Sequence, residues 1–495
     1  MSQLHPSRIP VLVGLGQSIE REKLVSIVDL TETASLAAFK DAPGLKEQID
    51  RVTTVSVIFS PSPKAPSREL VARLGLTNVE CESTTAGGNT PQWVVNRAAD
   101  DIATGKLKAT LIVGAEATRS MRAADPDANF FGASRGGGAD NKQESEPVVG
   151  PSMDGVLTKA EVSVGFTRPA EVYPVFESAL AAKAGRDMTQ QREHIGRLLE
   201  SWAKVAAANP FAWFKEEFTA SDISSPTTSN RLTAEPYTKR MNSFPNVDQG
   251  SALIVTSLEV AKAAGLEDQC VFPWAGATNT DVAPAARKDL GASPAVSAAA
   301  GAIFSATGIG INDFDFIDLY SCFPSAVQVL AEAIDLSLDD SRGLTQTGGM
   351  SFFGGPGNNY TSHSIISLAL RLRESGKLAY VAGNGGFLSK HSIGIYGSEP
   401  PKSGFCLADT KKQQAEINAA ALSTTIEATG KATVVGGTVV YGRDGAVSGA
   451  PVVADLPDGQ RIVAGADPSL LPDLAGESLV GKTISVSGSP LVYKL

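Results

Sequence analysis

Short runs of apolar residues alternate with segments of helical periodicity over most of the chain. The runs at 10–16 and 52–59 are typical of buried strands, and residues 27–41 between them have the pattern of a helix. A second helix is predicted to begin at Thr90, the expected N-cap, with Pro91 at its first position. Continuous apolar strands separated by helices indicate an α/β sheet that is covered on both faces.

Two parts of this region repeat one plan. Residues 101–114 contain a helix end, Gly-Lys-Leu, an apolar strand and a glycine, and residues 372–383 contain the same series. Earlier in each part, an aspartate opens an apolar strand, at Asp50 and again at Asp315. The aspartates are separated by nearly the same number of residues as the two Gly-Lys-Leu sequences. This shared spacing indicates a duplicated α/β unit.

An insertion at about 117–240 separates the halves, and the pattern of residues changes again after residue 397. Residues 132–155 are rich in Gly, Asp, Asn and Ser and are predicted to form a flexible loop. Beyond a Pro-Pro linker at 398–404, β-branched runs alternate with turn sequences. The expected domains are an N-terminal half at 1–256 that includes the insertion as a loop domain, a C-terminal half at 257–397, and a small all-β antiparallel barrel at 405–495.

Composition and charge exclude several classes of protein. Lys and Arg number 43 and Asp and Glu 53, for a net charge of −10, which disfavours nucleic acid and anionic membrane surfaces as partners. The four cysteines and four histidines have neither disulfide-scaffold nor metal-ligand spacing, so no metal is expected. The N-terminus has no signal-peptide core, and the uncharged stretch at 292–311 is predicted to be a buried helix rather than a membrane span. We expect a soluble, cytoplasmic protein without membrane insertion.

The duplicated halves, two glycine-rich segments and two motifs together point to a known family. The motifs are Val-Gly-Ala-Glu at 113–116 and Asn-Ser-Phe-Pro-Asn-Val-Asp-Gln-Gly-Ser-Ala at 242–252. On these features, residues from about 8 to 397 resemble the thiolase superfamily of acyltransferases, and particularly its sterol-carrier-protein-associated branch. The resemblance implies a duplicated thiolase-type α/β fold, a role in lipid metabolism, and coenzyme A (CoA) or an acyl-CoA thioester as ligand.

Thiolases use a cysteine at the N-terminus of a buried helix to attack the thioester, with a histidine, a second cysteine and an oxyanion-holding Asn or His. This sequence departs from that pattern at each position. Gly88 stands in place of the nucleophile, Gly355 of the histidine, Gly383 of the second cysteine, and Tyr320 of the oxyanion-holding residue. The nearby Cys81 belongs to the preceding strand. Because glycine offers no thiol, imidazole or proton, an acyl-enzyme cannot form, and we expect no thiolase activity.

Tyr320 and His391 are the candidate catalytic residues. Tyr320 occupies a catalytic motif position and could donate a proton; alternatively, its ring fills space and its hydroxyl bonds to the backbone. His391 follows the second glycine-rich turn and either faces the cavity or turns away from it. Four further residues near these motifs are candidates for the substrate pocket: Asn89, Cys322, Asn384 and His363. Cys322 is expected to behave as a small buried hydrophobe, and His363 as a surface or internally bonded residue.

Three functions are compatible with these features. The first is a thiolase-like protein that binds CoA or acyl-CoA without thiolysis, and with no covalently bound cofactor. The second is a lyase that cleaves a β-hydroxyacyl-CoA, because thiolase-like aldolases also lack the cysteines and carry a tyrosine at the oxyanion motif. Those aldolases work with a partner that has an oligonucleotide-fold domain, which the β-rich tail could supply in cis. The third is a non-catalytic scaffold that acts through the tail. The sequence leaves the choice between monomer and homodimer open.

Overall fold

Two sheets and the helices between and around them form the main body of the molecule. The computed structural model describes residues 5–128 and 145–495. The strands of the first sheet are β1 (Pro10–Ile19), β2 (Arg51–Thr54), β3 (Glu80–Thr84), β4 (Ala109–Ala117), β5 (Val148–Val149) and β8 (Asp248–Ser257), in the order β1-β8-β4-β2-β3-β5. Those of the second are β9 (Phe272–Thr280), β10 (Phe316–Leu319), β11 (Leu378–Gly385), β12 (Lys390–Gly397) and β13 (Cys406–Leu407), in the order β10-β11-β12-β9-β13.

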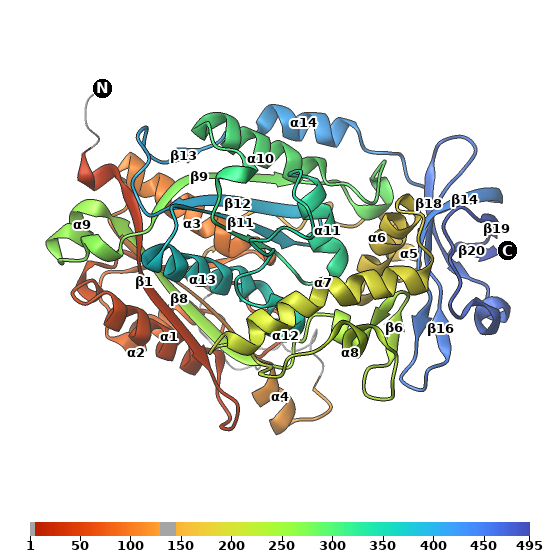
Figure 1. Ribbon diagram of the computed structural model, residues 1–495, viewed down its shortest axis with the longest axis horizontal. Coiled ribbons are helices and arrows are strands. Elements are labelled where there is room, and N and C mark those ends of the chain that lie inside the picture. Colours follow the sequence, from red (N-terminus) through yellow and green to blue (C-terminus); the bar gives the residue numbers. More distant parts are fainter. Residues whose placement is uncertain (1–4, 129–144) are drawn as a thin grey trace.

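Two helices, α3 (Thr90–Thr104) and α13 (Tyr360–Glu374), lie between the sheets, and their apolar side chains share one core with both of them (Figure 1). The outer helices are α1 (Ile27–Asp41), α2 (Pro66–Leu74) and α9 (Leu258–Ala263) on the first sheet, and α10 (Pro294–Thr307) and α11 (Pro324–Glu332) on the second. The predicted covering of both sheet faces is therefore confirmed. Asn89, rather than Thr90 as predicted, is the N-cap of α3, because the helical conformation already includes Thr90.

The two halves repeat one hydrogen-bonding pattern as well as one order of elements. The carboxylate of Asp50 accepts from the main-chain N–H of Lys108 at 2.9 Å, at the start of β4. In the second half, the carboxylate of Asp315 accepts from the N–H of Lys377 at 2.6 Å, at the start of β11. Each aspartate precedes a strand that runs parallel to the one it caps. The internal repeat read from the sequence thus reflects an equivalent contact in the structure.

The insertion between the halves is mainly helical. Its elements are α4 (Thr118–Ala124), α5 (Lys159–Ser163), α6 (Pro169–Lys183), α7 (Met188–Ala208), α8 (Ala220–Ser224), β6 (Leu232–Ala234) and β7 (Tyr237–Thr238). Most of the loop predicted at 132–155 lies outside the described residues. The helices α6 and α7 pack against the core beside the second sheet, so the insertion covers one end of that sheet.

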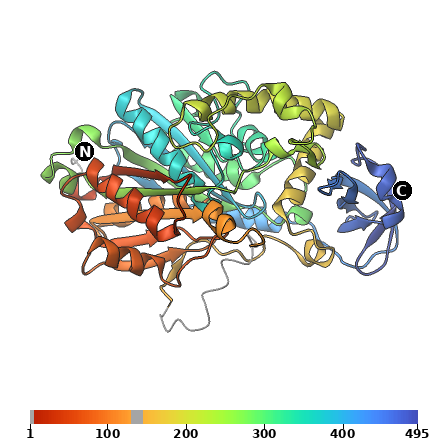
Figure 2. The ribbon, with the colours of Figure 1, turned by 90° about the horizontal axis from the view of Figure 1, so that it is seen from below.

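The C-terminal tail forms the expected small barrel, which stands at one end of the molecule (Figure 2). Its strands are β14 (Gly430–Gly437), β17 (Val452–Asp455), β18 (Arg461–Ala466), β19 (Thr483–Ser487) and β20 (Val492–Lys494). The pair β18 and β20 is parallel, so the barrel is not antiparallel throughout. Its strands also begin later than residue 405: β13 first joins the second sheet, and α14 (Lys411–Ala419) then packs on α10.

The barrel is joined to the main body by specific hydrogen bonds. The N–H of Gly437 donates to Ser178 Oγ of α6 at 3.0 Å, and the hydroxyl of Tyr441 donates to Glu235 Oε1 at 2.8 Å. Arg461 of β18 donates from Nη1 to the carbonyl oxygen of Arg287 at 2.7 Å. These contacts hold the C-terminal tail against α6, the turn between β6 and β7, and the segment before α10. No helix within the described ranges is long and apolar enough to cross a membrane.

Candidate functional site

The four motif positions singled out in the sequence lie on four segments that converge. Gly88 is in the turn between β3 and α3, Tyr320 follows β10 directly, and Gly383 lies in β11. Gly355 lies between the short helix α12 (Gly349–Phe352) and α13. The N–H of Tyr320 donates to the carbonyl of Ala382 at 3.0 Å, which ties the end of β10 to β11. The site therefore forms where a strand end meets a helix N-terminus, a common location for ligands in α/β folds.

The phenol of Tyr320 occupies the space that a side chain at position 88 would need. A Cβ atom added to Gly88 would overlap the hydroxyl of Tyr320 and would lie 2.6 Å from the carbonyl oxygen of Asn384. The carbonyl of Gly88 is held in turn by the hydroxyl of Thr361 at 2.5 Å. Only glycine fits at position 88 in this packing.

The hydroxyl of Tyr320 makes no hydrogen bond to any residue of the described chain. The residue is 6% exposed, and its ring packs edge-on against that of Tyr360 at 5.6 Å between centroids. Burial, together with the nearby Cys322 and Tyr360 groups, raises the pKa of Tyr320 well above its usual value. The phenol is therefore protonated at neutral pH and can act as a donor. The alternative expected from the sequence, a hydrogen bond from this hydroxyl to the backbone, is not formed in the described part of the chain.

Tyr173 of α6, which no sequence pattern singled out, completes the polar lining beside Tyr320. Its hydroxyl oxygen accepts from Asn384 Nδ2 at 3.1 Å and from the N–H of Leu388 at 3.0 Å. Its ring stacks on that of Phe323, with 4.4 Å between centroids. Burial raises the pKa of the adjacent Cys322 thiol to about 12, despite its hydrogen bond with Tyr173. Cys322 is thus a protonated, buried thiol rather than a nucleophile.

Two asparagines of the site have unused acceptor atoms. The Nδ2 group of Asn89 donates to Ser392 Oγ at 3.2 Å, but its Oδ1 atom is buried without a partner in the described part of the chain. The Oδ1 atom of Asn384 is likewise buried without a partner in the described part of the chain. Buried acceptors without partners each cost about 1–3 kcal/mol. Together with the free hydroxyl of Tyr320, they give the site unsatisfied hydrogen-bonding capacity.

The other two glycines have little space beside them. A Cβ atom at Gly355 would overlap the hydroxyl of Ser243, whose N–H donates to the carbonyl of Cys322 at 3.1 Å. A Cβ atom at Gly383 would lie 3.0 Å from the Cα atom of Asn89. Ser243 belongs to the motif at 242–252, but nothing in the sequence indicated that its side chain lies beside position 355.

The two candidate histidines do not bond to Tyr320. His363 is fully buried in α13, where Nδ1 lies 2.6 Å from Gln17 Oε1, and burial lowers its pKa to about 3. His391 is buried in β12, and its Nε2 atom lies 3.1 Å from the carbonyl oxygen of Leu388 and 3.3 Å from Asp281 Oδ2. His391 is therefore directed toward Asp281, beside the start of α10.

Lys390, a second residue that the sequence did not indicate, supports the turn that contains Gly88. Its ammonium group donates to the carbonyl of Ala86 at 2.6 Å and to that of Pro151 at 2.9 Å, and burial lowers its pKa to about 8. A lysine at a strand start is usually solvated, so its sequence position gave no signal. Within the described residues, no group of three His, Cys, Asp or Glu side chains is arranged to hold a metal ion.

Solved structures similar to this one identify the fold. A monomeric SCP2-thiolase like protein type 1 from Mycobacterium smegmatis matches 99% of both chains with 29% identity and a TM-score of 0.84. The chain has a thiolase-like fold with a C-terminal barrel. An Ltp2-ChsH2(DUF35) aldolase matches 80% of this chain and 99% of its own at 20% identity, with a TM-score of 0.61. An acetyl-CoA acetyltransferase from Syntrophomonas wolfei matches 79% and 99% at 15% identity, with a TM-score of 0.57. No protein-family model and no curated protein matches the chain.

The close packing at position 88 of this thiolase-like protein gives a stability prediction. Gly88→Ala is expected to lower the free energy of unfolding by about 1–3 kcal/mol or more, because the added methyl meets both the phenol of Tyr320 and the carbonyl of Asn384. On a Tyr320→Ala background the same glycine substitution is expected to cost less, since only the carbonyl of Asn384 then meets the methyl group. Gly301→Ala in α10, where a Cβ meets no atom within 4 Å, is the control and should stabilise by about 0.5–1 kcal/mol. Urea denaturation measures all three, and equal stability of the two single variants would contradict this packing.

The burial of His363 gives a prediction for the pH dependence of stability. The unfolded chain binds a proton at this residue as the pH falls through its ordinary value of 6.5, whereas the folded chain does so only near 3. Stability is therefore lost as the pH falls below about 6.5, by about 2 kcal/mol near pH 5 from this group alone. His363→Gln removes the titration and should lose correspondingly less stability between about pH 7 and about pH 5 in urea denaturation. Parallel curves for the variant and the parent would show that His363 does not contribute.

Proposed function

We infer that this protein binds a CoA thioester at the site around Tyr320 and does not form an acyl-enzyme. The observation that carries this inference is the phenol of Tyr320, which takes the place of a side chain at Gly88 and leaves its hydroxyl free. By the resemblance described above, position 88 corresponds to the thiolase nucleophile. Binding of this kind fits a cytoplasmic role in lipid metabolism.

The thiols of the chain are poor substitutes for the missing nucleophile. Burial raises the pKa of Cys322 to about 12, which leaves almost no thiolate at neutral pH. Cys81 lies in β3, where its Sγ atom is 3.7 Å from the carbonyl of Val79, and its pKa is also raised by burial and by the nearby Glu146. Thiolysis and Claisen condensation both need a thiolate at the acyl carbon, so neither is expected here.

The unsatisfied polar atoms support a ligand with both donors and acceptors. The hydroxyl of Tyr320 can donate to a thioester carbonyl oxygen, while the Oδ1 atoms of Asn89 and Asn384 can accept from amide or hydroxyl groups. An acyl-CoA carries a thioester carbonyl and the amides of its pantetheine arm. The similar acetyltransferase acts, by its name, on acetyl-CoA.

A second candidate function is cleavage of a β-hydroxyacyl-CoA, and the protonated phenol favours it. A base removes the β-hydroxyl proton, the Cα–Cβ bond breaks to give a carbonyl product and a thioester enolate, and the enolate takes up a proton. Tyr320 would donate a hydrogen bond to the developing enolate oxygen, a role that contributes on the order of 10²–10⁴ in rate. The similarity to a solved aldolase is compatible with this reaction.

Calorimetry with acetyl-CoA and with CoA tests the binding proposal. Saturable binding is expected, and Tyr320→Phe should weaken acetyl-CoA binding roughly threefold to tenfold by removing one hydrogen bond. The matched control is Tyr380→Phe on β11, whose buried hydroxyl has no partner among the described residues and whose ring packs among Phe304 and Phe314. It should leave the affinity unchanged. Absence of saturation would overturn the proposal and favour a scaffold that acts through the barrel.

Turnover assays on the same proteins separate binding from catalysis. Acetoacetyl-CoA with CoA should give no thiolysis above heat-inactivated protein. Release of a carbonyl product from β-hydroxyacyl-CoA would establish the lyase, and Tyr320→Phe should then lower kcat by about 10² or more. Equal turnover by Tyr320→Phe and the parent would exclude Tyr320 from the chemistry.

A further inference from the structure

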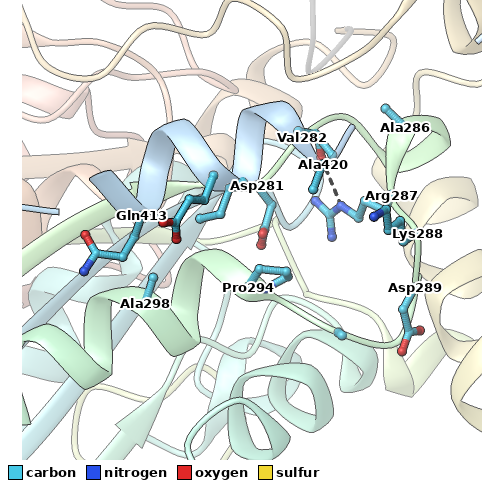
Figure 3. Close-up of a pocket in the computed structure, with 13 residues that line it drawn as sticks. Asp281, Val282, Ala286, Arg287, Lys288, Asp289, Pro294, Ala298, Gln413 and Ala420 are labelled. Atoms are coloured by element: carbon cyan, nitrogen blue, oxygen red, sulfur yellow. Dashed lines mark hydrogen bonds between the residues drawn. The ribbon is translucent and has the colours of Figure 1, made fainter. Parts of the chain in front are cut away.

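A cavity of about 370 Å³ lies on the outer side of the second sheet, apart from the lining around Tyr320 (Figure 3). It is bounded by the segment 281–292, the first turns of α10, and α14. Much of its wall is apolar, including Val282, Ala298 and Ile417. A cavity of this size is at the lower end of the range for small-molecule sites.

One charged side chain of this cavity has no hydrogen-bonded carboxylate among the described residues. Arg287 is only 3% exposed, and its Nη1 atom is buried without a hydrogen-bond partner in the part of the chain that the structure describes. In Figure 3 the guanidinium extends across the cavity toward Asp281. Its other nitrogens are used: Nε donates to the carbonyl of Val282 at 3.0 Å, and Nη2 donates to the carbonyl of Leu388 at 2.7 Å and to Ser389 Oγ at 3.1 Å.

The nearby carboxylate of Asp281 is already occupied. It accepts from the hydroxyl of Ser293, from the N–H of Ala295 at 2.9 Å, and from Nε2 of His391 at 3.3 Å. Burial raises the pKa of Asp281, but the hydrogen bond from His391 and the charge of Arg287 outweigh it and hold the pKa below its usual value. Asp281 therefore remains charged without bonding to Arg287. The guanidinium of Arg287 also lies 4.9 Å from the centroid of the Phe176 ring. A buried guanidinium normally has an anion in direct contact, and none of the described carboxylates bonds to Arg287.

The charges on exposed side chains of the lining indicate what kind of anion fits. Lys288 attracts an anion, whereas Asp289 and Glu416 repel one, and Asp281 adds a further negative charge deeper in the cavity. This balance disfavours groups with two or more negative charges, such as phosphate. It permits a single carboxylate that reaches Arg287 while its hydrocarbon part contacts the apolar wall.

We propose that this cavity binds a short aliphatic monocarboxylate, with the carboxylate on Nη1 of Arg287 and the chain against Val282, Ala298 and Ile417. Roughly four to eight carbons suit a cavity of this volume. The site would be additional to the thioester site and does not depend on it. A bound carboxylate would contact the same guanidinium that holds the turn between β11 and β12, because Arg287 also donates to the carbonyl of Leu388.

Thermal unfolding and calorimetry of the full chain with hexanoate, hexanol and inorganic phosphate test this proposal. Hexanoate is expected to raise the melting temperature. It should bind at least tenfold more tightly than hexanol, which lacks the negative charge, and than phosphate, which has more negative charge than the site accommodates. Equal binding of hexanoate and hexanol would overturn the role of Arg287. No binding of hexanoate would overturn the site.

Two variants locate the binding. Arg287→Met should abolish the preference for hexanoate, but it also removes the hydrogen bonds made by Nε and Nη2 and can prevent folding. Ala298→Phe fills the cavity from α10 without touching Arg287 and should weaken hexanoate binding at least tenfold, whereas Gly301→Ala on the same helix should not. Acetyl-CoA binding by Ala298→Phe should equal that of the parent, so failure of this site and failure of the thioester site are distinguishable. Unchanged hexanoate affinity in Ala298→Phe would place the ligand elsewhere and contradict the proposal.

Discussion

The contact between Gly88 and Tyr320 fixes how the two halves of the molecule meet at the site. The N-terminus of α3 comes from the first half and the end of β10 from the second, and they approach so closely that position 88 has no room for a Cβ atom. The carbonyl of Asn384 in β11 closes the same space at 2.6 Å from that position. Since α3 is packed between both sheets, this approach cannot relax without moving a central helix. The packing of the core thus determines that the site has a phenol where a side chain of the helix turn would otherwise stand.

The phenol of Tyr320 determines the chemistry available at the site. A thiolate at a helix N-terminus is a nucleophile that the helix dipole stabilises. A buried phenol with a raised pKa is instead a neutral donor, suited to hydrogen bonding with a carbonyl or enolate oxygen. Cys322 and Tyr173 next to it are likewise kept protonated by burial. The side chains directly beside Tyr320 are therefore neutral hydrogen-bonding groups.

How far the sequence predicts the structure depends on the distance between partners along the chain. The duplicated halves could be predicted because Asp50 and Asp315 each lie in a repeated local pattern, and the barrel because turn sequences punctuate its strands. Tyr173 could not be predicted as part of the site, because its partner Asn384 is more than two hundred residues away. The start of the tail was also misplaced, since β13 and α14 are held by contacts with β9 and α10 rather than by local sequence. Local patterns were thus accessible from sequence, whereas the groups that surround the candidate site depend on tertiary packing.

Arg287 connects the barrel, the cavity beside α14 and the turn between β11 and β12, which are far apart in the sequence. Its carbonyl accepts from Arg461 of the barrel, while its side chain holds the turn between β11 and β12. Phe387 and Leu388 in that turn have φ values of 41° and 59°, a left-handed conformation that costs on the order of 1–3 kcal/mol for each such residue. Such a turn persists only where its surroundings specify it, and here Arg287 and the hydroxyl of Tyr173 bind it from two sides. Because Tyr173 also binds Asn384, the barrel, the cavity at α14 and the lining around Tyr320 are joined by one continuous series of hydrogen bonds.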